Sequence, residues 1–473
     1  MNADTESQLR WAFRSLGAPT TKRRILSLFW RIAIIGGAGL LLALGATRYP
    51  LFDAAVVPLL AGLLLLLSVC HVLRPADDAE AQRILRLCLG AFAAHVAIGL
   101  IINHSPSLVQ YFGGDAVTYD QGARMIVAHW HNQAMPLPIM GAGKEGFYYA
   151  LGGLYWVFGA YPVAGLALNA FFASALVPVL HDVTRRLFGS HAGWWAALIV
   201  TFQPGFLIWT SQLLREAGVI FFLAVALDCT LRLTTRATAG PALVLAADIA
   251  LLLTFRADVA LVAAGGLMAG LILGRKRVVG ALLTAVLVLG MVAVLVGAVG
   301  LGRAGYHAST SVSLQEVSLA RSDLAGSGGS GFDANADVST PSRAIGYLPV
   351  GLPSFLLGPF PWQVRNARQV LGCLEALTVL AMAWFAWRGW REAGPQIGRK
   401  RLVLVMPAAA LAISLTLLIG NYGTVVRERL QLLVFLVPLM ALGCATRQAR
   451  IRTANAGGSG SVSTPLLPGL GDY

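Results

Sequence analysis

The sequence has few charged residues and none of the common signatures of a soluble enzyme. Only 12% of its 473 residues are Asp, Glu, Lys or Arg, whereas 57% are hydrophobic, and the mean hydropathy is +0.70. This composition is too apolar for a soluble globular domain, so we expect the lipid bilayer to be its solvent. No P-loop, dinucleotide fingerprint or HExxH motif is present, so the sequence does not indicate a nucleotide, redox or classical zinc enzyme.

Cysteine is also scarce, and nucleic-acid binding is not indicated. The cysteines lie inside apolar runs without CxxC or other metal-ligand spacing, so we interpret them as small apolar residues. The formal charge of +14 is spread over short basic clusters between the apolar runs, which favours membrane topology over a nucleic-acid partner as its cause. The five cysteines are Cys70, Cys88, Cys229, Cys373 and Cys444.

Long apolar runs make up most of the chain. A transmembrane helix needs about 20 predominantly apolar residues, and this length predicts an all-α polytopic membrane protein with about 12 transmembrane helices. The chain then divides into a cytoplasmic N-terminal segment (1–24), a transmembrane domain (25–446) and a disordered cytoplasmic tail (447–473). The predicted spans are Ile25–Ala46, Ala54–Leu73, Leu87–Ile102, Val163–Leu180, Leu187–Ile208, Ala217–Leu231, Ala242–Phe255, Val259–Gly274, Val278–Gly300, Val370–Trp387, Leu402–Gly420 and Leu430–Ala445.

The distribution of basic residues predicts the orientation. Most of the 36 Lys and Arg residues fall between spans on the side of the N-terminus, and basic loops are usually cytoplasmic. We therefore expect a plasma (inner) membrane protein with both termini in the cytoplasm and the active site on the outer or periplasmic face. Two long loops, about 104–146 and 301–368, then lie outside. A short interfacial helix is expected at Phe147–Phe158. The segment Tyr347–Trp362 is too interrupted by proline for a span, so we expect it to lie in the interface or to re-enter the membrane.

The first outer loop carries the candidate catalytic residue Asp115. It follows two glycines just beyond a predicted span, where a carboxylate can face a cavity and act as a general base for a hydroxyl group. Tyr119, Asp120 and His129 follow it in a helix-compatible segment. Alternatively, Asp115 caps this helix and Asp120 interacts favourably with its N-terminal dipole.

Arginines at three other outer span ends are candidate phosphate ligands. They are Arg215 beside Glu216, Arg256 near Asp258, and the pair Arg427 and Arg429 around Glu428. A guanidinium offers permanently charged, bidentate donors to a phosphate. The alternative is that each arginine is an interfacial anchor paired with its neighbouring acid.

A metal cofactor is not certain from the sequence. Asp115 and a histidine could together hold a divalent metal ion, although no recognised ligand spacing is present.

Between Tyr111 and Arg232 the sequence resembles the GT-C superfamily of membrane glycosyltransferases, in particular bacterial protein mannosyltransferases and lipid A aminoarabinose transferases. The likeness rests on Gly114-Asp115 with Tyr119, on the aromatic segment Phe147–Gly159, and on later short motifs. These motifs are Leu168-Asn169-Ala170, the basic turn Thr184–Gly189, Gln203-Pro204, Ser211 and Arg215-Glu216.

The resemblance implies a catalytic base at Asp115 and a sugar donor carried on a polyprenyl phosphate held by outer arginines. The family commonly has an Asp-Glu pair in this loop, whereas Ala116 follows Asp115 here, so the second acid is either absent or supplied by Asp120 or Glu216. The family's loop also usually follows the first span, and here it follows the third.

We therefore predict a glycosyltransferase that moves a sugar from an outward-facing polyprenyl-phosphate donor to a hydroxyl group of a glycan, lipid or protein, in contact with membrane lipids. Asp115, Asp120 and Glu216 are the candidate catalytic residues. Arg215, Arg256, Arg427 and Arg429 are the candidate phosphate ligands, with Tyr119 and His129 in support. The alternatives are a polymerase or ligase of lipid-linked polysaccharide and a flippase or transporter of a lipid-linked solute.

Overall fold

The computed structural model describes residues 50–112, 114–133, 144–275, 277–298, 313–326, 329–364 and 367–457. Within these ranges the regular structure is helical, apart from one isolated β-bridge between Gly331 and Asn421. The all-α prediction is confirmed for this part of the chain. The predicted first span, Ile25–Ala46, and the N-terminal segment 1–24 lie outside the described residues.

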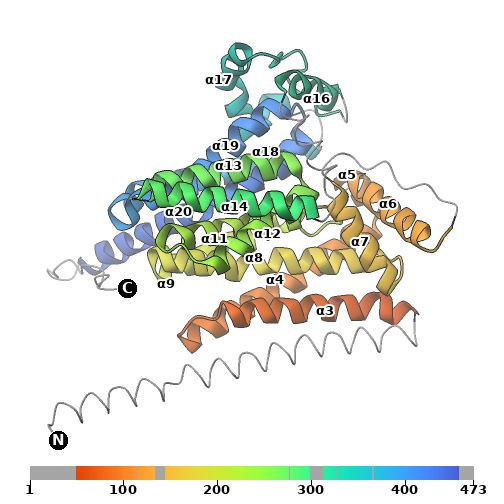
Figure 1. Ribbon diagram of the computed structural model, residues 1–473, viewed down its shortest axis with the longest axis horizontal. Coiled ribbons are helices and arrows are strands. Elements are labelled where there is room, and N and C mark those ends of the chain that lie inside the picture. The colour runs from red at the N-terminus through yellow and green to blue at the C-terminus, as the bar shows by residue number, and fades with distance from the viewer. Residues whose placement is uncertain are drawn as a thin grey trace, which may run out of the picture.

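Most long helices run roughly parallel or antiparallel in one bundle (Figure 1). The α-helices are α3 (Pro50–Val72), α4 (Asp78–His104), α5 (Pro106–Phe112), α6 (Gly114–Trp130), α7 (Glu145–Phe158), α8 (Pro162–Phe188), α9 (Ser190–Phe202), α10 (Pro204–Trp209), α11 (Glu216–Thr235), α12 (Ala239–Phe255), α13 (Ala257–Gly274), α14 (Val278–Ala298), α16 (Leu314–Gly326), α17 (Pro341–Leu357), α18 (Ala367–Ile397), α19 (Leu402–Leu418) and α20 (Tyr422–Gly457). Two 3-10 turns, η1 (Pro361–Gln363) and η2 (Gly398–Arg401), complete the described elements. Shorter helices, among them α5, α6, α16 and α17, gather at one end of the bundle (Figure 1). We call it the pocket end, after the cavity described below.

Eight segments of the described chain are helical, long and apolar enough to cross a membrane. One of them, Gln369–Leu418, covers most of α18 and all of α19, and α12 is a shorter apolar helix. The structure supports a multi-pass membrane protein, but the predicted number of about twelve spans is not confirmed.

The fifth predicted span, Leu187–Ile208, is interrupted in the structure. α9 ends at Phe202, and α10 begins at Pro204. Proline has no N–H to donate and is favoured at the first position of a helix, while the Gln203 side chain accepts a hydrogen bond from the Phe206 N–H at 2.6 Å. The break brings the short helix α10 to the pocket end.

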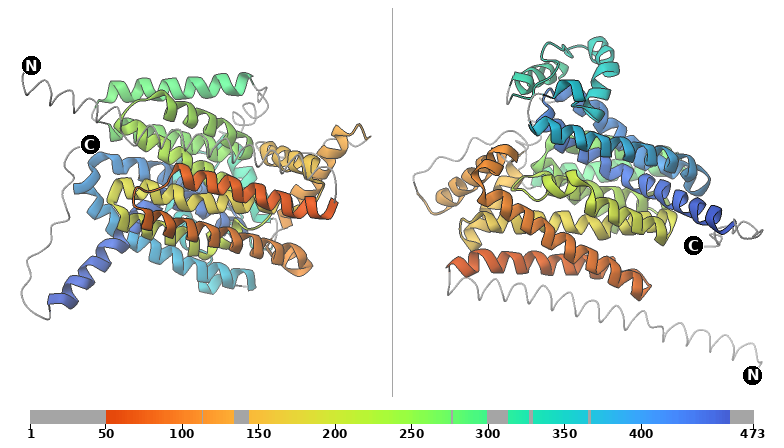
Figure 2. Two further views of the ribbon diagram at one scale, coloured as in Figure 1. Left: turned by 90° about the horizontal axis from the view of Figure 1, so that it is seen from below. Right: turned by 180° about the vertical axis from the view of Figure 1, so that it is seen from behind.

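Burial separates a central group of helices from a peripheral one. In α8, α11 and α20, 78–83% of the apolar window is buried inside the protein, whereas the values are 22% for α3 and 28% for α14. Figure 2 shows α3 and α14 at the edges of the bundle. Their outward faces are apolar, as Val279 at 72% exposed and Leu283 at 61% illustrate, and such faces suit contact with lipid.

The two predicted outer loops contain much helix. The segment 104–146 includes α5 and α6, and the segment 301–368 includes α16, α17 and η1. The helix expected at Phe147–Phe158 is found as α7. In the segment 347–362, α17 continues through Pro349 and Pro353 and ends at Leu357. At the other end, α20 extends to Gly457, so the start of the predicted disordered tail is helical.

A buried arginine holds α16 and α17 against the bundle. Arg321 of α16 is fully buried and donates hydrogen bonds to the backbone oxygens of Thr416 and Ile419, at 3.0 and 2.7 Å, and to the Tyr347 hydroxyl at 2.5 Å. The segment after α16 also pairs with the start of α20, because Tyr422 N–H donates to the Ser330 oxygen at 3.0 Å. These bonds fix one wall of the cavity described next.

Candidate functional site

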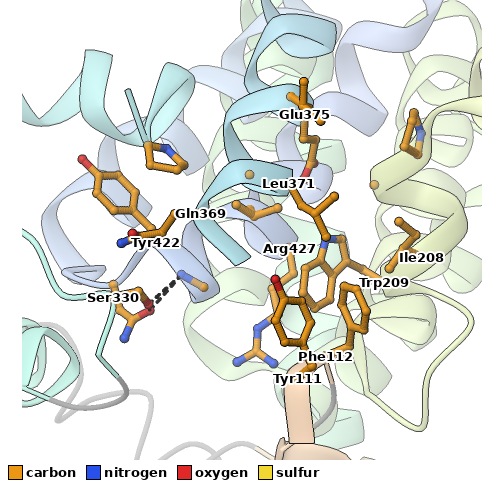
Figure 3. A pocket seen from close by; sticks show the side chains of 18 of the residues that line it. Tyr111, Phe112, Ile208, Trp209, Ser330, Gln369, Leu371, Glu375, Tyr422 and Arg427 are labelled. Carbon is orange, nitrogen blue, oxygen red and sulfur yellow. Dashed lines mark hydrogen bonds between the residues drawn. The ribbon is translucent and has the colours of Figure 1, made fainter. Parts of the chain in front are cut away.

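A cavity of about 550 Å³ lies at the pocket end, between α5, α6, α10, α18 and α20 (Figure 3). Aromatic side chains form one side, with the rings of Phe112 and Trp209 6.1 Å apart. Polar groups enter from α6, α18 and α20. They include Asp115, Gln369, Glu375, Asn421, Tyr422 and Arg427.

Asp115 and Arg427 meet in this cavity. Asp115 lies in the first turn of α6, and its Oδ2 is 2.6 Å from an Arg427 terminal nitrogen. The Asp115 side chain is 55% exposed, whereas that of Arg427 is 18% exposed. Asp115 thus reaches the open cavity while it pairs with a largely enclosed guanidinium.

Glu216 forms a second ion pair with Arg427, on the side away from the cavity. Its Oε1 lies 3.7 Å from the Arg427 Nε, its side chain is only 3% exposed, and it does not line the cavity. Because a buried carboxylate cannot reach a substrate in the cavity, the arrangement favours a positioning role for Glu216 over the role of a second catalytic acid.

The charges around Asp115 determine its protonation. Burial alone would raise the pKa of this carboxyl, but Arg427 and, more weakly, Lys144 and Arg215 outweigh burial and lower the pKa below its usual value. The Lys144 pKa is lowered because burial and the nearby Arg215 and Arg256 disfavour its charge. Asp115 is therefore ionised at neutral pH in this state.

Arg215 and Arg256 lie beside this site without lining the cavity. Arg256 is 4% exposed and pairs with Glu428 at 2.5 Å and with Asp258 at 3.4 Å. Arg215 donates a hydrogen bond to the Phe255 oxygen at 3.2 Å. Arg215 adds positive potential near Asp115, whereas the charge of Arg256 is balanced by its acidic partners.

Arg429 does not face the cavity, contrary to the sequence-based expectation of a phosphate ligand. It is fully buried and donates to the backbone oxygens of Leu356 and Gly358, at 2.9 and 2.8 Å. These bonds attach the end of α17 to α20, next to Pro359 in the cavity wall.

The remaining candidates of the first outer segment lie on α6 but do not line the cavity. Asp120 accepts hydrogen bonds from the Arg124 Nε at 2.9 Å and the Tyr155 hydroxyl at 2.5 Å, and it does not line the cavity. Tyr119 is 6% exposed and packs edge-on against Phe147, with ring centroids 5.0 Å apart. His129 is exposed near the end of α6.

Glu375 and Gln369 are cavity residues that sequence reasoning did not select. They come from α18 and are 8% and 5% exposed. A glutamate inside an apolar helix is a recognised sign of a functional site, so the sequence held a signal for Glu375. Gln369 is neutral and carries no comparable signal.

No group of three or more His, Cys, Asp or Glu side chains suited to a metal ion occurs in the described part of the chain. Asp115, one of the acids that line the cavity, has Arg427 as its partner.

These observations define a class: a helical protein with several apolar helices long enough to cross a membrane and an ion-paired, partly apolar cavity at one end of the bundle. No protein-family model matches the chain, and no curated protein matches it. Among solved structures, it is similar to ArnT from Cupriavidus metallidurans.

The crystal structure of ArnT bound to undecaprenyl phosphate is 12% identical in sequence, with a TM-score of 0.48, and the match covers 80% of this chain and 64% of ArnT. The apo structure is 13% identical with a TM-score of 0.42, and that match covers 78% and 62%. The chain thus spans less than two thirds of the length of ArnT.

Proposed function

We propose that this protein is a membrane glycosyltransferase that moves a sugar from a polyprenyl-phosphate donor to a hydroxyl acceptor. The observation that carries the proposal is the ion pair of Asp115 and Arg427, which joins a candidate base and a candidate phosphate ligand in one cavity. The GT-C-like motifs between Tyr111 and Arg232 support the same reaction class.

The cavity walls support a lipid-linked donor. Leu371 and Leu374 of α18 line the cavity and are also 45% and 55% exposed on the outside of the helix. An apolar wall that continues onto a lipid-facing surface allows a prenyl chain to enter sideways from the bilayer. The phosphate of such a donor would then meet Arg427.

Arg427 and Asp115 would change partners when the donor binds. In the free protein Arg427 neutralises Asp115 and lowers its pKa. When the donor phosphate takes over the guanidinium, Asp115 loses this partner and becomes a stronger base. Donor binding would thereby activate the catalytic carboxylate.

The transfer step follows from these roles. Asp115 takes the proton of the acceptor hydroxyl as its oxygen forms a bond to the anomeric carbon. The bond between that carbon and the phosphate oxygen breaks on the opposite face, so the configuration inverts. Polyprenyl phosphate leaves with the bonding electrons, and Arg427 stabilises the charge that develops on it.

Replacing Asp115 by Asn tests this proposal. We expect sugar transfer to fall by about 10²-fold or more, the usual contribution of a general base, with expression and binding of polyprenyl phosphate retained. The measurement is transfer from a radiolabelled polyprenyl-phosphate sugar in membranes that hold equal amounts of each variant.

Asp323→Asn is the matched control, because Asp323 is exposed on α16 and outside the cavity. Wild-type transfer by Asp115→Asn would remove the base from the proposal. Loss of activity on Arg427→Ala with full activity of Asp115→Asn would favour a polysaccharide polymerase or ligase without an acidic base.

A further inference from the structure

A second cavity, of about 340 Å³, lies further along α18, towards the end of the bundle opposite the pocket end. We call it the Trp–Arg cavity. It is formed by two helices, with five residues of α18 and one of α20. They are Trp384, Trp387, Arg388, Arg391, Glu392 and Arg450.

The Trp–Arg cavity is positively charged. Arg388 lies over the Trp384 ring at 6.0 Å, and Arg391 lies over the Trp387 ring at 5.2 Å. Arg450 pairs with Glu392 at 2.8 Å, with side-chain exposures of 67% and 37%. Glu392 is the single acid among the lining residues, so three arginines face one carboxylate.

An apolar stripe on α18 leads directly to this cavity. Leu374, Leu377 and Leu380 are 53–61% exposed, and the exposed Trp384 and Trp387 continue the same face of the helix. Positions that recur every three or four residues share one face of an α-helix. The stripe is therefore a lipid-facing surface that ends in tryptophan and arginine.

The length of α18 places the two ends of this stripe at opposite membrane boundaries. From Leu371 to Arg391 the helix advances about 30 Å at 1.5 Å per residue, which matches a hydrocarbon core of about 30 Å. Because Leu371 lines the cavity that holds Asp115, the Trp–Arg cavity falls at the level of the opposite headgroups.

We propose that the Trp–Arg cavity binds the phosphate headgroup of an anionic phospholipid, whose acyl chains lie along the Leu374–Trp387 stripe. Arginine forks suit a phosphate diester, and indole rings prefer the boundary between headgroups and chains. Arginines that merely anchor the helix would lack a concave site, whereas here three converge on one. Net positive charge selects anionic over zwitterionic lipid.

Lipid retention by native mass spectrometry tests this site. The full-length protein is placed in nanodiscs of equimolar phosphatidylglycerol and phosphatidylcholine, and the lipids that remain bound are counted. We expect the wild type to retain phosphatidylglycerol preferentially. In Arg388→Gln/Arg391→Gln, retention should fall by about 25-fold, because each basic residue removed costs about fivefold.

Arg236→Gln/Arg399→Gln is the matched control, since it removes two exposed arginines outside the cavity. Unchanged phosphatidylglycerol retention in the cavity variant would overturn the proposal, as would an equal fall in the control. Displacement of the lipid by equimolar soluble glycerol phosphate would show an anion site without lipid specificity and would equally overturn it.

If the double variant does not fold, Arg450→Gln gives the same comparison, because it alters one exposed side chain near the end of α20. Its expected result is a partial, severalfold loss of phosphatidylglycerol, and no loss would count against the site. The readout is lipid binding, so it does not depend on whether the protein transfers a sugar.

Discussion

Arg427 organises the candidate site at the scale of single residues. It contacts Asp115 on the cavity side and approaches the buried Glu216 on the other. Burying a guanidinium is costly unless acids surround it, so Glu216 helps keep Arg427 charged and oriented while Asp115 occupies its accessible side. An incoming phosphate therefore competes with Asp115 for a guanidinium that is already in position.

The pH dependence of the reaction tests this exchange. The Asp115 pKa is lowered in the free protein, mainly because Arg427 outweighs the effect of burial. A base must be ionised, so kcat/KM should stay level as pH falls and drop only below the usual carboxyl range. In Arg427→Gln, the charge that lowers the Asp115 pKa is gone, so burial should raise this pKa. The pH at which kcat/KM begins to fall should therefore be higher than in the wild type.

Arg427→Lys is the informative companion. It keeps the charge, so the acidic limb should stay at low pH, but it loses the bidentate fork and should raise KM for the donor. An acidic limb that does not move in Arg427→Gln would mean that another group is the base.

Close helix contacts at glycine explain the packing at the scale of elements. A side-chain carbon on Gly266 of α13 would lie 2.5 Å from the Pro407 Cα, and one on Gly270 would lie 2.8 Å from the Val403 Cα. The same occurs between α18 and α20, where a carbon on Gly389 would lie 1.8 Å from the Leu439 oxygen. Small residues let helix backbones approach in a membrane, where apolar surface alone gives little drive for association.

Adjacent glycines on α13 give a direct test. Gly266→Ala should destabilise the protein by about 1–3 kcal/mol, the usual cost of overpacking, because the Pro407 backbone cannot move aside easily. Gly265→Ala is the control, because a carbon there has open space around it. Both changes raise helix propensity by the same amount, so Gly265→Ala should leave the stability of the protein unchanged or raise it slightly. Thermal unfolding in detergent measures the difference, and equal midpoints would contradict close packing of α13 on α19.

The whole molecule separates into two chemically different ends. The pocket end carries the cavity of Asp115 and the helices α16 and α17, which Arg321 attaches to α19. The opposite end carries basic clusters such as the η2 turn, Gly398–Arg401. Because basic segments favour the cytoplasm, we expect the pocket end to face outward.

Cysteine labelling tests this orientation. In a variant without the five native cysteines, Ser342→Cys at the start of α17 should react with a membrane-impermeant maleimide in intact cells. Gln396→Cys near the end of α18 should react only after permeabilisation. Both positions are exposed, so the reverse pattern would invert the topology and place the cavity on the cytoplasmic side.

The sequence by itself determined the class of the molecule, because apolar length and charge spacing are local properties. The helices α11, α13 and α19 follow the predicted spans closely. Asp115 and Arg427 were both in the predicted set, since isolated charges at the ends of apolar runs stand out in any chain of this composition. Pro204 marks a possible helix break in the sequence. That a new helix begins there depends on Gln203, whose side chain caps α10.

The tertiary structure alone decided which candidates share a cavity. Arg427 and Arg429 are two residues apart on α20, and such positions point about 200° apart around a helix, so one faces the cavity and the other binds the end of α17. Likewise Asp115 faces Arg427 while Asp120 faces Tyr155. The direction in which a side chain points depends on the helices packed around it, and that packing joins residues hundreds of positions apart.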